Sequence, residues 1–214
     1  MSELLASIAL RTVVVSGVAT ALAVLVGVPA GYAIARRSFR GRTILLGLIN
    51  TGMGMPPVVV GLVVWLLLVR SGPFGDLDLI YTQRAMVLAQ FLIATPIVIG
   101  FTTASFQALS PRLPDLLVVL GAGRMRRLWL LAREARLGLL VAIMAAFGAI
   151  VSEVGASMIA GGNLERSTRV LTTAIVTETS RGEVERALSL GLVLLVMSFV
   201  VNLSLTVIQQ RSRA

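Results

Sequence analysis

Five long runs with almost no charge constrain this chain more than any other feature of its sequence. Each run exceeds the ~20 apolar residues that a helix needs to cross a hydrocarbon core about 30 Å thick. Hydrophobic residues make up 57% of the 214, and a soluble domain of this length could not bury so much apolar surface. The runs are 12–35, 43–69, 85–111, 137–164 and 187–210. The run 137–164 contains one charged residue, Glu153, and the other four contain none.

The sequence therefore predicts an all-α membrane protein that forms a single domain over residues 1–214. We expect five transmembrane helices, at about 9–35, 43–69, 85–108, 137–160 and 187–210. The first is not expected to be a cleaved signal peptide, because it is too long and follows Glu3 instead of a basic segment. Pro56 and Pro57 should kink or unwind the second helix, since each lacks a backbone N–H.

The arginines are distributed unevenly between the two ends of these helices. All 19 basic residues are arginine. Twelve of them, against two acids, fall in residues 36–42, residues 112–136 and the C-terminus, whereas the other side has seven of each sign. By the positive-inside rule the N-terminus lies outside and the C-terminus in the cytoplasm of a prokaryotic plasma membrane. We prefer this reading of the +9 net charge to nucleic-acid binding.

Residues 112–136 are rich in arginine and glycine and separate the third run from the fourth. The pattern predicts two short amphipathic helices on the cytoplasmic surface, the second at about 124–135. Asp115 suits the first turn of the first helix, and Gly121 and Gly123 allow a sharp turn after it. Such a pair suits a socket in a partner protein, and the alternative is a helix that only holds lipid headgroups. The candidate coupling residues are Asp115, Leu116, Leu117, Leu120, Gly121, Ala122, Gly123 and Leu131.

Polar residues inside the runs are candidates for a transport pathway or a gate. Helical spacing places three of them in one stripe on the first helix, although such a stripe more often packs against another helix. Glu153 is either a gate or proton site, or a carboxylate near the outer face that bonds neighbouring helices, which we favour. The candidates are Thr12, Ser16, Thr20, Thr95, Thr102 and Glu153.

The composition argues against catalysis by this chain. It has no histidine, cysteine or lysine, so no nucleophile–base–orienter set can be assembled. It also lacks a glycine-rich phosphate loop with its Lys–Ser/Thr pair, so any energy from ATP must come through another subunit. A self-contained channel or ion-coupled carrier is the main alternative, but it would need a charge relay or a selectivity ring.

The chain resembles the integral membrane subunit, or permease, of ABC importers, and within that family the oxyanion branch, closest to tungstate-type permeases. In the family's cytoplasmic coupling motif, Asp115 stands for the acid, Gly121 for the glycine and Leu131 for the later apolar residue. Two departures occur, because Leu116 and Leu117 replace two alanines and Arg133-Glu134 replaces a Leu-Pro end. The segments similar to tungstate-type permeases are Asn50–Gly61, Ser152–Ala156, Gly161–Asn163 and Thr168–Ile175.

This resemblance implies a type I importer fold with a coupling-helix loop between the third and fourth membrane helices. It implies a homodimer of this subunit, two cytoplasmic ATPase subunits docked on residues 112–136, and an extracytoplasmic protein that delivers the anion. ATP and magnesium would be used by the ATPase, with no cofactor in this chain. Molybdate, sulfate and other ions remain alternatives to tungstate.

Overall fold

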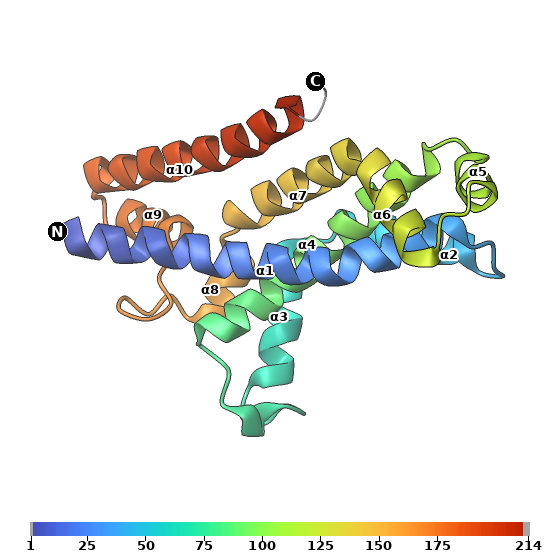
Figure 1. Cartoon of the computed structure of the whole chain (residues 1–214). Coiled ribbons are helices and arrows are strands. Elements are labelled where there is room, and N and C mark those ends of the chain that lie inside the picture. The colour runs from blue at the N-terminus through green and yellow to red at the C-terminus, as the bar shows by residue number, and fades with distance from the viewer. Residues whose placement is uncertain (1, 212–214) are drawn as a thin grey trace.

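Three long helices run along the length of the molecule. They are α1 (Ser2–Arg36), α4 (Gln83–Gln107) and α10 (Val184–Arg211), and each is long and apolar enough to cross a membrane. Figure 1 shows α1 and α10 running side by side from the end that holds the N-terminus. The computed structural model describes residues 2–211, which contain helices and no strand. Arg213, counted above among the cytoplasmic arginines, lies outside these residues.

Helix α1 begins well before the predicted residue 9. The charged side chain of Arg11 does not end it, because its guanidinium donates to the backbone carbonyls of Glu165 (3.2 Å) and Arg169 (3.1 Å). These bonds satisfy the charge at the end of the bundle where residues 163–170 return toward α1. The helix can therefore continue through Arg11 toward the N-terminus.

The predicted second span is broken into two helices. Helix α2 (Arg42–Met53) and α3 (Pro57–Leu68) meet at an angle of 99°. The break lies at Gly54–Pro56, so the prediction that Pro56 and Pro57 interrupt this helix is confirmed. Proline favours the first helical position because the missing N–H would have no helical partner there, and Pro57 occupies it in α3. Helix α3 consequently leaves the direction of the bundle (Figure 1).

The prediction of one helix over residues 137–160 is wrong, because the structure has two helices there. Helix α7 (Arg136–Val151) ends at Ser152, and a short helix, α8 (Gly155–Gly161), begins after residues 152–154. Glu153 lies in this break and not inside a helix. Its own side chain stabilises the break, because the carboxylate accepts the backbone N–H of Ala156 in the first turn of α8.

The number of membrane spans depends on how the bent helices are counted. Three helices qualify alone, and up to five spans result if each of two bent pairs counts as one. One pair is α2 with α3. The other is α6 (Arg124–Glu134) with α7, which meet at 67°.

The core lies where α1, α4, α7 and the α3–α8 pair meet. Helices α1 and α4 approach most closely at two glycines spaced four residues apart. A Cβ on Gly27 would lie 2.8 Å from Val98, and one on Gly31 would lie 2.7 Å from Thr102. Small residues such as these let membrane helices pack at short range. The buried cluster around this contact includes Ala19, Ala23, Val64, Ala89, Ala94, Val98, Ala146, Ile150 and Ala160.

Two shorter elements occupy the loops. A 3-10 helix, η1 (Gly75–Leu77), lies in the loop between α3 and α4. The segment between α8 and α10 contains α9 (Leu171–Ser180), which packs against α10 and buries Leu171 and Ala174. Figure 1 places α8 and α9 near the N-terminal end of α1, and α5 (Leu113–Val119) with α6 near its other end.

Candidate functional site

Two short helices, α5 and α6, lie together at the end of the bundle opposite the N-terminus (Figure 1). Their bounds, Leu113–Val119 and Arg124–Glu134, agree with the helices predicted within residues 112–136. Asp115 lies in the first turn of α5, where a negative charge interacts favourably with the helix dipole. The charge pattern and the glycines were therefore sufficient to locate both helices.

The turn between α5 and α6 depends on one glycine. Gly121 has φ +72°, a left-handed conformation that residues with a Cβ adopt only at a cost. Its N–H donates to the carbonyl of Val118, and the next N–H, of Ala122, donates to that of Leu117, both at 2.9 Å. These two bonds end the helix in the way typical of a left-handed C-terminal glycine. Gly123, by contrast, has φ −59° and directly precedes α6.

The predicted coupling residues divide into two groups. Leu131 is only 1% exposed and, with the partly buried Leu117, packs against Phe106 and Ala135. These two leucines attach α5 and α6 to the ends of α4 and α7. Leu116 and Leu120 are exposed, as are Asp115, Gly121 and Gly123, and Ala122 is half-buried.

The exposed apolar residues of this pair form what we call the α5–α6 surface. Its most exposed members are Val119, at 83%, and Met125, at 79%. Neither was among the predicted coupling residues. In the sequence Val119 is one of several consecutive apolar residues, and Met125 stands alone between two arginines, so neither is conspicuous. Exposed apolar side chains in an otherwise arginine-rich segment are typical of a surface that contacts a protein or a membrane. The α5–α6 surface consists of Leu116, Val118, Val119, Leu120, Met125 and Trp129.

The stripe of hydroxyl residues on α1 is buried and takes part in packing. Thr12 donates to the carbonyl of Ile8 and accepts the backbone N–H of Leu171, at the start of α9, at 2.9 Å. Thr20 donates to the carbonyl of Ser16. Thr12 thus connects α1 to α9, and a lining role of the stripe in a pathway stays a prediction.

Two other candidate pathway residues, Thr95 and Thr102, lie on α4. Thr95 donates to the carbonyl of Phe91, one turn back along α4. Thr102 is fully buried opposite Gly31, and its hydroxyl oxygen has no hydrogen-bond partner in the structure. A lining role for Thr95 and Thr102 stays a prediction, as it does for the stripe on α1.

Glu153 joins three elements at the break between α7 and α8. Its Oε1 atom accepts the N–H of Ala156 in α8, and its backbone carbonyl accepts the hydroxyl of Thr172 in α9 at 3.0 Å. Helix α3 packs against the same break, since its Val58 lies so close to Gly155 that a Cβ there would collide with it. This geometry agrees with the interpretation of Glu153 as a carboxylate that bonds neighbouring helices.

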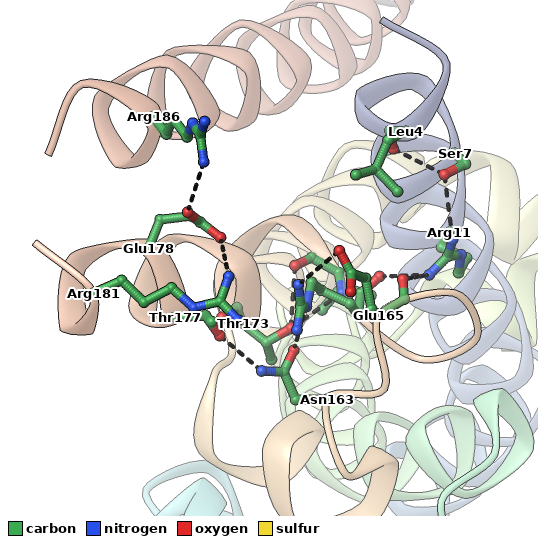
Figure 2. A network of polar contacts seen from close by, with 12 residues as sticks. Leu4, Ser7, Arg11, Asn163, Glu165, Thr173, Thr177, Glu178, Arg181 and Arg186 are labelled. Carbon is green, nitrogen blue, oxygen red and sulfur yellow. Dashed lines mark hydrogen bonds and ion pairs between the residues drawn. The ribbon is translucent and has the colours of Figure 1, made fainter. Parts of the chain in front are cut away.

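A polar network at the N-terminal end of α1 was not predicted from the sequence (Figure 2). Arg11 reaches the loop before α9, where Arg169 donates to Asn163 at 3.3 Å and Asn163 donates to Thr177 at 2.8 Å. Glu178 of α9 lies 3.2 Å from Arg181 and 4.0 Å from Arg186 of α10. The alternation of arginine and glutamate over residues 165–186 was visible in the sequence, but the contacts with α1 were not.

Comparison with known proteins gives a consistent result over nearly the whole chain. Residues 23–214 match the family described as binding-protein-dependent transport system inner membrane component. A probable anion ABC transporter permease protein of Haloferax volcanii is 40% identical over 203 residues, which cover 92% of this chain and 88% of that protein.

Two similar proteins are tungstate uptake system permease proteins named TupB. The protein from Peptoclostridium acidaminophilum is 38% identical over 191 residues, or 89% of this chain and 84% of its own length. The protein from Campylobacter jejuni is 34% identical over 155 residues, or 72% of this chain and 65% of its own length.

Proposed function

Because the chain belongs to the family of binding-protein-dependent transport system inner membrane components, we propose that it forms, with a second copy of itself, the membrane path of an ATP-driven tungstate importer. It is the permease subunit of an ABC importer for an oxyanion. The proposal adds the substrate, the homodimer and the surface through which the ATPase acts.

The α5–α6 surface supports the proposed contact with two cytoplasmic ATPase subunits, one for each copy of the permease. It presents six exposed apolar side chains on two helices whose mutual orientation is set by the Gly121 turn. Leu131, buried near the C-terminal end of α6, packs against residues at the ends of α4 and α7. A displacement of the ATPase subunits would therefore move the ends of two helices that form the core. The exposed α5–α6 surface, packed through Leu131 on the ends of α4 and α7, is the structural observation that supports the proposal most directly.

The choice of tungstate is supported by the two TupB proteins, each more than 30% identical to this chain. An extracytoplasmic binding protein would deliver the anion and set most of the selectivity. Molybdate, sulfate or another ion is the alternative substrate, and a self-contained carrier or channel is the alternative mechanism. The sequence has no glycine-rich phosphate loop with a Lys–Ser/Thr pair, so we expect ATP to bind to the separate ATPase subunits.

The proposal is tested by reconstitution of the permease in vesicles with the ATPase and binding protein encoded beside it. We expect uptake of tungstate that requires ATP and both partners. Excess sulfate should not compete with this uptake. Uptake by the permease alone would instead indicate a carrier or a channel. ATP-driven uptake of molybdate or sulfate in preference to tungstate would keep the mechanism and reject the substrate.

The proposed orientation has five spans, the N-terminus outside, and α5, α6 and the C-terminus in the cytoplasm. Single cysteines can be introduced because the chain has none. Arg126→Cys on α6 should react with an impermeant thiol reagent only after the cells are opened, whereas Arg166→Cys should react in intact cells. Both side chains are exposed, so a difference in labelling reports the side of the membrane. Labelling of Arg126→Cys in intact cells would contradict this orientation.

A further inference from the structure

A cavity of about 280 Å³ lies between the N-terminal part of α1, helix α9 and the beginning of α10. It is separate from the α5–α6 surface, which lies at the other end of the bundle (Figure 1). Part of its wall is charged and comes from α9, α10 and the preceding loop. The rest is apolar and comes mainly from α1 and α10. No function proposed above uses this cavity.

The charged wall carries one net positive charge. Arg169, Arg181 and Arg186 line it with two acids, Glu165 and Glu178. Arg169 is paired with Glu165 at 3.7 Å, and Glu178 is shared between the other two arginines. Glu183 also lies 3.9 Å from Arg186 but is not part of the wall.

The guanidinium groups of Arg181 and Arg186 have donors to spare. Their side chains are 57% and 62% exposed, whereas that of Glu178 is 12% exposed and fixes their position from one side. Each guanidinium has five N–H donors and uses few of them on these glutamates. Two such groups beside one cavity favour an anion with several oxygen acceptors, such as a phosphate group.

The apolar wall belongs to two helices that are long and apolar enough to cross a membrane. Leu5 and Ile8 come from α1, and Leu190 comes from α10. Beside the cavity α10 packs on α9 and buries Leu190, whereas none of its most apolar 18-residue window is buried, against 33% for α1 and 44% for α4. Ile8 and Leu190 are already buried against α9, whereas Leu4 is 41% exposed and Leu5 is half-buried. An acyl chain would cover these two leucines, and a free oxyanion would not.

We propose that this cavity binds one membrane phospholipid, with the phosphodiester on Arg181 and Arg186 and an acyl chain against Leu4 and Leu5. A phosphodiester carries one negative charge and so balances the single excess positive charge of the wall. The lipid occupies the cavity beside the contact that α9 makes with α1 and α10. A free tungstate dianion matches neither the charge nor the apolar wall.

The test measures phospholipid that stays bound to the purified importer complex. The complex is exchanged into detergent with phosphatidylglycerol, and bound lipid is counted by native mass spectrometry. We expect about one lipid per permease chain, and about tenfold weaker retention in R181Q/R186Q, which loses two charge-assisted contacts. Arg166→Gln is the matched control, because it removes an exposed arginine of the same outer segment that does not line the cavity.

Three further measurements separate a lipid from other occupants. Ser189→Phe, which fills the mouth of the cavity from an exposed position, should exclude the lipid with both arginines intact. Diacylglycerol, which has the chains without the phosphate, should not be retained. Equal retention of phosphatidylglycerol by the wild type and R181Q/R186Q, or of diacylglycerol by the wild type, would overturn the proposal. Full displacement of the lipid by an equal concentration of inorganic phosphate or tungstate would identify a free-oxyanion site instead.

Discussion

Glu153 accepts a hydrogen bond from the backbone N–H of Ala156 through its Oε1 atom, at 2.9 Å. The first turn of a helix has N–H groups without helical partners, and here the side chain of a residue just before α8 satisfies one of them. A carboxylate within a largely apolar segment of the chain therefore has a structural use that needs no proton transfer. It fixes the direction of α8, which packs on α3 and α4.

A pair of substitutions at Glu153 separates this role from that of a proton site or charged gate. Glu153→Gln keeps an oxygen that can accept the N–H of Ala156, so uptake and thermal stability should stay close to those of the wild type. Glu153→Ala removes the acceptor and should cost about 1 kcal/mol of stability, with reduced uptake. Thermal unfolding in detergent and vesicle uptake measure the two effects. Loss of uptake in both variants alike would show that the negative charge itself is required.

The two helix breaks show which part of this fold the sequence could predict. Pro56 and Pro57 mark a break directly, because neither can donate a backbone hydrogen bond. The break at Ser152–Val154 carries no such signal, since Glu153 is a tolerable helix residue and Gly155 alone is a weak indicator. It depends on contacts with Val58 and Thr172, which are distant in sequence. A continuous helix was therefore the natural but wrong expectation.

The candidate sites differ in the same way. Helices α5 and α6 were predictable because their signals, glycine and amphipathic spacing, are local. The contact of Arg11 with the carbonyl of Arg169 joins residues 158 positions apart, and no local pattern indicates it. The Gly27–Gly31 spacing is typical of close helix packing, but only the structure identifies Val98 and Thr102 on α4 as the partners.

Substitution of Gly121 should impair coupling, whereas the same change at Gly123 should not. A Cβ at either position meets no atom within 4 Å, so the two differ only in backbone conformation. Gly121 has φ +72° and Gly123 has φ −59°. The left-handed conformation costs a residue with a Cβ roughly 1–2 kcal/mol, and a β-branched residue tolerates it least.

We therefore expect Gly121→Val to lower ATP-driven uptake strongly while membrane insertion and dimer formation persist. Gly123→Val is the matched control and should retain most of the uptake. Asp115→Ala should have a smaller effect than Gly121→Val, since it removes only a favourable helix-dipole interaction of about 0.3–1 kcal/mol. Normal transport by Gly121→Val would mean that α5 and α6 do not couple ATP hydrolysis to transport.

Enlargement of Gly31 should destabilise the contact between α1 and α4. A Cβ there would lie 2.7 Å from that of Thr102 and 2.9 Å from the carbonyl oxygen of Ile99, so the helices would have to separate. Overpacking of this kind typically costs about 1–3 kcal/mol. Gly17→Ala on the same helix is the control, because its Cβ would meet nothing within 4 Å. Gly31→Ala should lower the melting temperature of the permease in detergent, and an unchanged value would show that α1 can shift without cost.

The permease alone should bind tungstate weakly, because its polar membrane residues already have partners or lack charge. The hydroxyls of Thr12, Thr20 and Thr95 donate to backbone carbonyls of their own helices. A path of this kind favours release, since an oxyanion held by paired arginines inside the membrane would leave slowly. The cavity at α9 and α10 is lined by arginines on one side and by leucines on the other. This lining suits a phosphodiester with an acyl chain and not a free dianion.

Calorimetry of the purified permease without its binding protein should therefore show no tungstate or molybdate binding tighter than about millimolar, ~4 kcal/mol. R181Q/R186Q should give the same result, because the cavity is not a tungstate site. The isolated binding protein is the positive control and should bind its anion far more tightly. Submicromolar binding by the wild-type permease would contradict this prediction and indicate a dedicated anion site in the membrane domain. If that binding disappeared in R181Q/R186Q, the site would be the cavity between α1 and α10.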